Sequence, residues 1–130
     1  MLQDIKKLLE RNALFLAILA TIIIGILSLI SVPKLNMGLH IKSGDKYLHF
    51  IAYFGLSSIW YFALKDRIPK RVFNFFVPLT LIVYGIILEG LQSGITTYRT
   101  ADIYDALANT AGVIAALILF NRIIKWYRTI

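Results

Sequence analysis

The sequence predicts an all-α integral membrane protein, a four-helix bundle with both termini on the cytoplasmic side. Hydrophobic residues make up 58% of the chain, compared with about 45–50% in soluble globular domains. A soluble chain of 130 residues has too small an interior to bury so much apolar surface. Short polar or basic segments divide the sequence into four apolar stretches, and the length is that of a single domain.

The first apolar stretch, residues 13–32, contains no charged residue and is long enough to cross the roughly 30 Å hydrocarbon core of a bilayer. It exceeds the 7–15 apolar residues of a typical cleaved signal peptide and lacks a clear A-x-A cleavage site, so we interpret it as an anchor. The basic segment 1–12 has leucine and isoleucine at helical spacing. It is predicted to be a cytoplasmic interfacial segment, with a frayed polar tail as the alternative.

Three further helices are expected, over about residues 46–64, 72–93 and 103–120, which makes 13–120 the transmembrane domain. Proline, glycine and asparagine in residues 33–44 indicate a loop, and Asp45 is placed to cap the helix that follows. The short connector KDRIPKR joins the second and third helices, and the polar segment 94–101 joins the third and fourth. Residues 121–130 are predicted to form a cytoplasmic tail.

The distribution of basic residues predicts the orientation. Ten of the 14 lysines and arginines lie in the amino-terminal segment, the second connector and the tail, and four lie in the first and third connectors. Because cytoplasmic loops carry the excess of lysine and arginine, both termini are predicted to be cytoplasmic, in a multi-pass protein of the cell membrane.

The net charge and the cysteine content exclude some classes of function. The net charge is +7, but a nucleic-acid-binding domain gathers its basic residues on one solvated face. Here they lie in short clusters between apolar runs, where topology signals and anionic lipid headgroups account for them. Membrane lipids are therefore the predicted partners, and nucleic acid is excluded. The chain has no cysteine, hence no disulfide framework and no thiolate chemistry.

Polar residues interrupt the last three helices at one common depth. With the predicted topology, His49, Glu89 and Asp105 each lie roughly 5–8 Å inside the outer end of a helix. Helical spacing places each of them on a stripe with its neighbours. The three stripes are Asp45, His49 and Tyr53; Gly85, Glu89 and Gln92; and Asp102, Asp105, Asn109 and Gly112. Since the rest of each helix is apolar, the stripes are expected to face one another and to form a polar pocket open to the outside.

Each part of this layer has both a functional and a structural interpretation. Glu89, His49 and Asp105 are candidates for acid–base catalysis, because partial burial raises the pKa of a carboxyl group. Arg99 would bind an anionic group of a ligand, or pair with Glu89 and hold the third connector in place. Asn109 is a candidate for orienting the ligand, but a single interhelical hydrogen bond is also a common packing device.

Metal binding and helix packing are the remaining interpretations. His49 and the carboxylates could hold a divalent cation, but no HExxH or similar ligand spacing is present. The sequence therefore predicts no metal and no other cofactor. Gly85 and Gly112 are expected to permit close contact between helices.

The same residues resemble a known family. The strings DKYLHFIAY at 45–53, EGLQ at 89–92 and RTADIYDALANTAG at 99–112 are similar to the VanZ-like family of small bacterial membrane proteins. The resemblance covers about residues 31–120. The motif residues that carry over are Asp45, Lys46, His49, Tyr53, Glu89, Gln92, Arg99, Asp105, Asn109 and Gly112. Asp102 and Ala116 depart from the residues common in the family.

The resemblance implies a polytopic protein of Gram-positive-type envelopes, whose namesake confers low-level resistance to the glycopeptide teicoplanin. It suggests a lipid-linked envelope precursor or a lipoglycopeptide as a partner of the polar pocket. Three functions stay open at this point. The chain binds or modifies an envelope component, is a membrane-embedded hydrolase or transferase using Glu89, His49 and Asp105, or is a structural subunit whose polar layer only packs helices.

Overall fold

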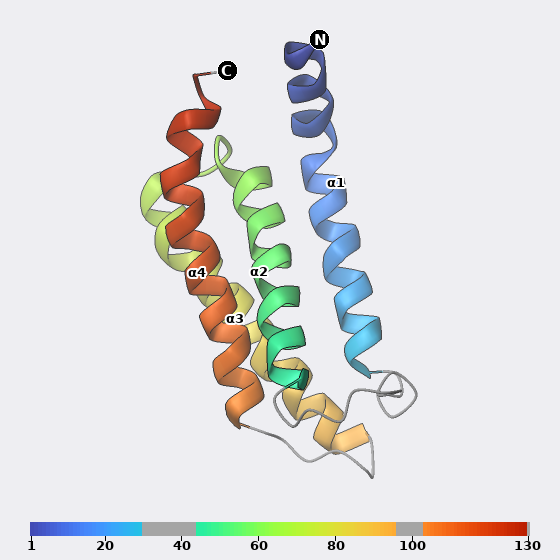
Figure 1. Cartoon of the computed structure of the whole chain (residues 1–130). Coiled ribbons are helices and arrows are strands. Elements are labelled where there is room, and N and C mark those ends of the chain that lie inside the picture. The colour runs from blue at the N-terminus through green and yellow to red at the C-terminus, as the bar shows by residue number, and fades with distance from the viewer. Residues whose placement is uncertain (30–43, 96–102, 130) are drawn as a thin grey trace.

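The computed structural model describes residues 1–29, 44–95 and 103–129, with side chains described except at 44–46 and 92–95. Four α-helices fill these ranges: α1 (Leu2–Leu29), α2 (Gly44–Leu64), α3 (Lys70–Ile95) and α4 (Ile103–Tyr127). Consecutive helices run in opposite directions, so both termini lie at the same end of the bundle (Figure 1).

The all-α prediction is confirmed, because each of the four described helices is long and apolar enough to cross a membrane. At the end of the bundle that carries both chain termini, the bounds of α1 and α4 differ from those expected from the sequence. The segment expected to form a separate interfacial element is continuous with the first span, since α1 begins at Leu2. Most of the expected tail is helical too, since α4 runs to Tyr127. Both segments lack glycine and proline, the residues that most strongly disfavour the interior of a helix.

The contact between α2 and α4 is the most extensive in the bundle. Gly112 of α4 lies directly against the backbone of α2: a Cβ atom added to it would stand 2.5 Å from the carbonyl oxygen of Phe50 and 3.0 Å from the amide nitrogen of Phe54. Further along the interface, the Tyr61 hydroxyl donates a hydrogen bond of 3.1 Å to the carbonyl oxygen of Val113. Small residues thus allow backbone contact, and the buried hydroxyl finds a backbone acceptor.

The central core fills the space between α2, α3 and α4. Its buried members are Tyr53, Leu56, Tyr61, Phe73, Leu81, Val113 and Ala116. Aromatic contacts extend it toward the terminal end, where the ring of Tyr61 lies 5.4 Å from that of Phe73 and 6.0 Å from that of Phe120, centroid to centroid.

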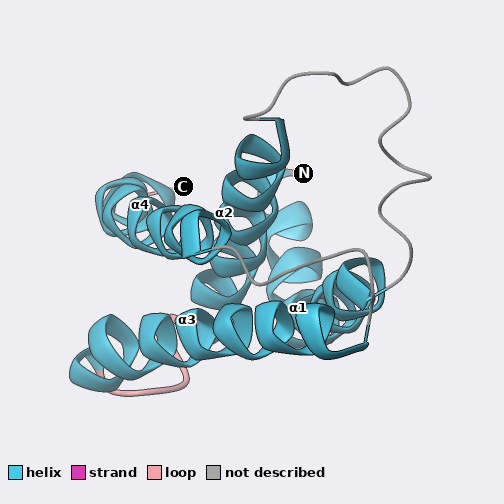
Figure 2. Ribbon diagram, turned by 90° about the horizontal axis from the view of Figure 1, so that it is seen from below, coloured by secondary structure: helices cyan, strands magenta, loops and turns pink. Residues whose placement is uncertain are grey.

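Helix α1 packs mainly on α2 and also contacts α3, and in the end-on view α1 and α4 lie on either side of α2 (Figure 2). Ala13 and Ala17 of α1 form a buried cluster with Ala63 of α2. Thr21 then links three helices, because its hydroxyl accepts from Trp60 Nε1 at 2.8 Å and its carbonyl accepts from the Tyr84 hydroxyl at 2.6 Å. In an apolar surrounding such bonds satisfy groups that water cannot reach.

Large apolar side chains cover the outside of all four helices. Phe15, Ile22 and Ile26 on α1 are each more than half exposed, and comparable residues occur on the other helices. An exposed apolar surface of this extent is typical of a face that contacts lipid.

Four charged residues form an ion cluster at the terminal end of the bundle. Lys65 Nζ lies 3.0 Å from Glu10 Oε1 and 2.8 Å from Asp66 Oδ2, and Arg128 Nη2 lies 2.9 Å from Asp66 Oδ1. These residues, called the terminal ion cluster below, join α1, the α2–α3 connector and the end of α4. Hydrogen bonds from Lys65 and Arg128 hold the pKa of Asp66 below its ordinary value of 3.8. The sequence analysis did not predict this cluster.

Candidate functional site

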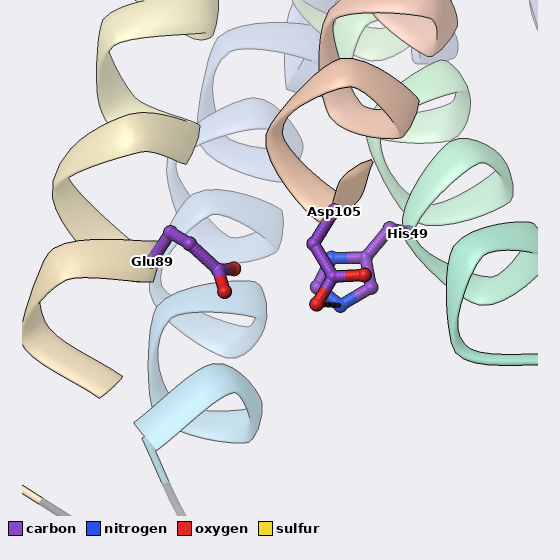
Figure 3. A group of neighbouring side chains, drawn as sticks. All are labelled: His49, Glu89 and Asp105. Carbon is purple, nitrogen blue, oxygen red and sulfur yellow. Dashed lines mark ion pairs between the residues drawn. The ribbon is translucent and has the colours of Figure 1, made fainter. Parts of the chain in front are cut away.

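Three helices each bring one ionisable side chain to the same place, at the end of the bundle opposite the termini. His49 comes from the start of α2, Glu89 from near the end of α3, and Asp105 from the first turn of α4. Each offers a nitrogen or oxygen atom, and these atoms all lie within 4.8 Å of one another. Figure 3 shows the side chains converging from the three helices. We call these three residues the polar triad.

The carboxylates of the triad are buried. Glu89 is 7% exposed and Asp105 is 3% exposed, whereas the side chain of His49 is 16% exposed. In each helix the surrounding sequence is apolar and the polar residue falls on the face that packs inward. The arrangement therefore places ionisable groups in a region of low dielectric, where burying a charge is costly unless it is partnered.

Asn109 contacts the His49 ring at Nδ1. Its Oδ1 atom lies 3.0 Å from His49 Nδ1, and an amide oxygen only accepts hydrogen bonds. The Nδ1–H group is therefore the donor. In the neutral ring this leaves the lone pair on Nε2, which lies 3.7 Å from Asp105 Oδ2. That separation is longer than a hydrogen bond.

Gly85 and Tyr53 lie beside Asn109. A Cβ atom added to Gly85 would stand 3.2 Å from Asn109 Nδ2 and 3.2 Å from Tyr53 Cε1. Tyr53 is buried, and its ring lies 6.4 Å from that of Tyr84. Gly85 therefore leaves room for the amide that orients His49.

The remaining predicted site residues cannot be placed relative to the triad. Asp45 and Lys46 lie in the first turn of α2 and Gln92 lies in the last part of α3, but their side chains are not described. Arg99 and Asp102 fall outside the described residues. Their parts in ligand binding stay predictions.

Sequence reasoning missed the terminal ion cluster because it interpreted the basic residues as topology signals and as contacts for anionic lipid headgroups. A signal was present: Glu10 and Asp66 fall, by the predicted topology, on the same side as most of the lysines and arginines. It also missed Thr21, Trp60 and Tyr84, whose hydrogen bonds join α1 to the rest. Nothing in their spacing distinguishes these residues from ordinary interfacial ones.

Comparison with known families decides the membership of the chain. Residues 2–125 match the VanZ/LLP1 family. The chain belongs to this family. The match confirms the resemblance based on the three motifs and extends it across α1, so the chain is a multi-pass membrane protein with four candidate spans. No curated protein and no solved structure matches the chain.

Proposed function

We propose that this VanZ-family protein binds or modifies the polar part of a lipid-linked or cell-wall component through the polar triad and its neighbours. The observation that supports this most directly is the convergence of His49, Glu89 and Asp105 from three helices within 4.8 Å. Helices can be packed without ionisable residues, and such residues inside membrane spans most often mark functional sites. The link between the family name and teicoplanin makes low-level glycopeptide resistance the cellular readout.

In this proposal the triad faces the outer leaflet and both termini are cytoplasmic. Two observations support the orientation. Basic residues are concentrated in the amino-terminal segment, the second connector and the tail, and both termini lie at the end opposite the triad (Figure 1). A polar pocket at that level would admit a headgroup or glycan while the lipid chain stays in the bilayer.

The residues near the triad have complementary roles in the proposal. Asn109 and Gln92 orient the ligand, and Tyr53 contributes to the wall of the pocket. Arg99 and Lys46 bind an anionic group such as a phosphate, for which arginine is suited by its planar, bidentate geometry. Asp45 and Asp102 add acceptors at the pocket mouth.

A hydrolase or transferase is the second candidate, and one observation favours it. The His49 ring is held through Nδ1 by Asn109, and its Nε2 points toward Asp105 at 3.7 Å. A positioned imidazole with one free nitrogen is suited to accept or donate a proton during a reaction. In this version Glu89 and Asp105 share the acid–base work, and turnover replaces simple binding.

The test combines resistance with stability. The wild type and the variants Glu89→Gln, His49→Ala and Asp105→Asn are expressed in a susceptible Gram-positive host, and growth is measured against teicoplanin. Their melting temperatures are measured in detergent, with Glu10→Gln of the terminal ion cluster as the matched control.

We expect the triad variants to lose resistance while melting close to the wild type, and the control to keep both properties. Loss of resistance in proportion to loss of stability would instead favour a structural layer. A wild type that confers no resistance would remove glycopeptide resistance from the proposal.

A further inference from the structure

We propose that His49, Glu89 and Asp105 bind a divalent transition-metal ion, most suitably zinc, between α2, α3 and α4. The proposal concerns the residues used by the proposed function, but it does not require that function. Its test measures metal content, so the two can fail separately.

The state of the histidine ring is the first argument. A metal-binding histidine almost always donates its other ring N–H to an oxygen acceptor, which fixes the tautomer and orients the ring. His49 has this arrangement, since Nδ1 donates to Asn109 Oδ1 at 3.0 Å. Asn109 is itself 3% exposed, so the pair is held inside the bundle. The lone pair of Nε2 is thereby directed toward the carboxylates.

Separation of the ligand atoms is the second argument. Zinc bound tetrahedrally by nitrogen and oxygen at about 2.0–2.2 Å holds its ligand atoms about 3.3–3.5 Å apart. His49 Nε2 and Asp105 Oδ2 lie 3.7 Å apart, too far for a hydrogen bond and close to the spacing around one ion. A Glu89 oxygen lies within 4.8 Å of a His49 ring nitrogen and of an Asp105 oxygen. A shift of about 1.5 Å or less, which rotation of the glutamate side chain can supply, brings it to the spacing that zinc needs.

The ligand type selects the ion. An imidazole beside carboxylates favours zinc, iron or cobalt over magnesium and calcium, which prefer oxygen alone. Among the described residues the ligands number three, which leaves a fourth position, as in catalytic rather than structural zinc sites. A phosphate or carbonyl oxygen of a ligand fits that position.

The spacing of these residues in the sequence does not match a known metal-binding motif. Metal motifs such as HExxH place two ligands one helical turn apart, whereas His49, Glu89 and Asp105 come from three helices. A spacing search therefore finds nothing, and the ligand set becomes visible only when the helices are packed.

Metal analysis of the full chain tests the proposal. The protein is purified in detergent with its affinity tag removed, stripped with a chelator, dialysed against zinc, and analysed by mass spectrometry for bound metal. The chain has a second histidine, His40, so His40→Ala serves as the matched control for His49→Ala. Glu10→Gln serves as the control for Glu89→Gln and Asp105→Asn.

The wild type is expected to bind about one zinc per chain. Each triad variant should weaken zinc binding by about tenfold or more, and both controls should leave it unchanged. Circular dichroism checks that each variant keeps its helices. If a variant fails to fold, cobalt substitution of the wild type provides the test, because a four-coordinate nitrogen and oxygen site produces visible absorption bands.

Two results would overturn the proposal. One is a folded wild type that holds no stoichiometric metal and shows no cobalt bands. The other is zinc binding that is unaffected in the Glu89→Gln/Asp105→Asn double variant, because the ion would then be held elsewhere.

Discussion

Charged side chains gather at both ends of the bundle, and the two groups differ in burial and in partners. In the terminal ion cluster, Asp66 is more than half exposed and meets lysine and arginine at 2.8–2.9 Å. In the polar triad, two carboxylates are less than a tenth exposed, and one of them faces a histidine nitrogen at 3.7 Å. In the first group oppositely charged atoms lie within hydrogen-bond distance, and most of the side chains reach water. In the second group both carboxylates are buried between three helices.

The energetic cost separates the two groups further. Exposed ion pairs stabilise a protein by about 0–1 kcal/mol. In the terminal ion cluster the Lys65 side chain is 5% exposed, but its partners Glu10 and Asp66 are 38% and 55% exposed, so water still screens these pairs. Burying carboxylates carries a desolvation penalty that packing alone does not demand. In our proposals, binding of a ligand or a metal ion accounts for the placement of these carboxylates beside a histidine that contacts Asn109.

Substitution of Gly112 is expected to have the largest effect on stability and on metal binding, because the geometry of the triad depends on the close contact between α2 and α4. Gly112→Ala places a carbon 2.5 Å from the Phe50 carbonyl oxygen, so the helices must separate. We expect a loss of about 1–3 kcal/mol or more of stability, together with loss of metal binding. The control is Gly55→Ala, whose added carbon meets nothing within 4 Å among the described residues. Melting curves in detergent measure both, and equal stability of the two variants would contradict the packing described here.

Substitution of Asn109 is expected to have the next largest effect, on zinc affinity, because Asn109 orients His49 without being a ligand itself. Asn109→Ala should weaken zinc binding by about 10–100-fold, as expected for loss of the residue that holds a ligating histidine. Thr110→Val is the control, since the Thr110 hydroxyl donates to the Ala106 carbonyl oxygen within α4, at 2.8 Å. Zinc titration of both proteins gives the comparison. Unchanged affinity in Asn109→Ala would show that the His49–Asn109 bond does not position a ligand.

The terminal ion cluster should respond weakly to loss of a charge. Glu10→Gln removes the partner of Lys65 on α1 and should cost about 1 kcal/mol or less. The difference from wild type should shrink as salt is added, because exposed charges are screened. Unfolding measured at low and high salt checks this. A larger, salt-independent loss would mean that the cluster resembles the buried triad more than a surface network.

The smallest expected effect is the contribution of Asp66 to the pH dependence of stability. Lys65 and Arg128 lower the pKa of Asp66 below 3.8 in the folded protein. Its contribution to stability is therefore fully present above about pH 3.8 and is lost as the pH falls through the lowered folded pKa. Melting temperatures between pH 6 and pH 3 should fall slightly more for wild type than for Asp66→Asn. Parallel curves would indicate that Asp66 does not contribute through its charge.

The sequence was a good guide to the elements and to part of the site. Four apolar stretches predicted four helices, because a hydrocarbon core requires both length and the absence of charge. Periodicity also placed His49, Glu89 and Asp105 on inward faces at one depth. It did not predict that α1 begins at Leu2 or that α4 runs to Tyr127, because hydropathy measures where a helix is apolar and not where it ends.

What the sequence by itself determined is the membrane class, the helices, the family motifs and the residues of the polar layer, all of which follow from local composition and spacing. Only the tertiary structure decided which atoms meet. The bond from His49 to Asn109, the 3.7 Å approach of His49 to Asp105 and the backbone contact at Gly112 join residues from different helices. Such contacts depend on how helices rotate and approach one another, and that is set by the sum of packing contacts across the bundle rather than by any single stretch of sequence.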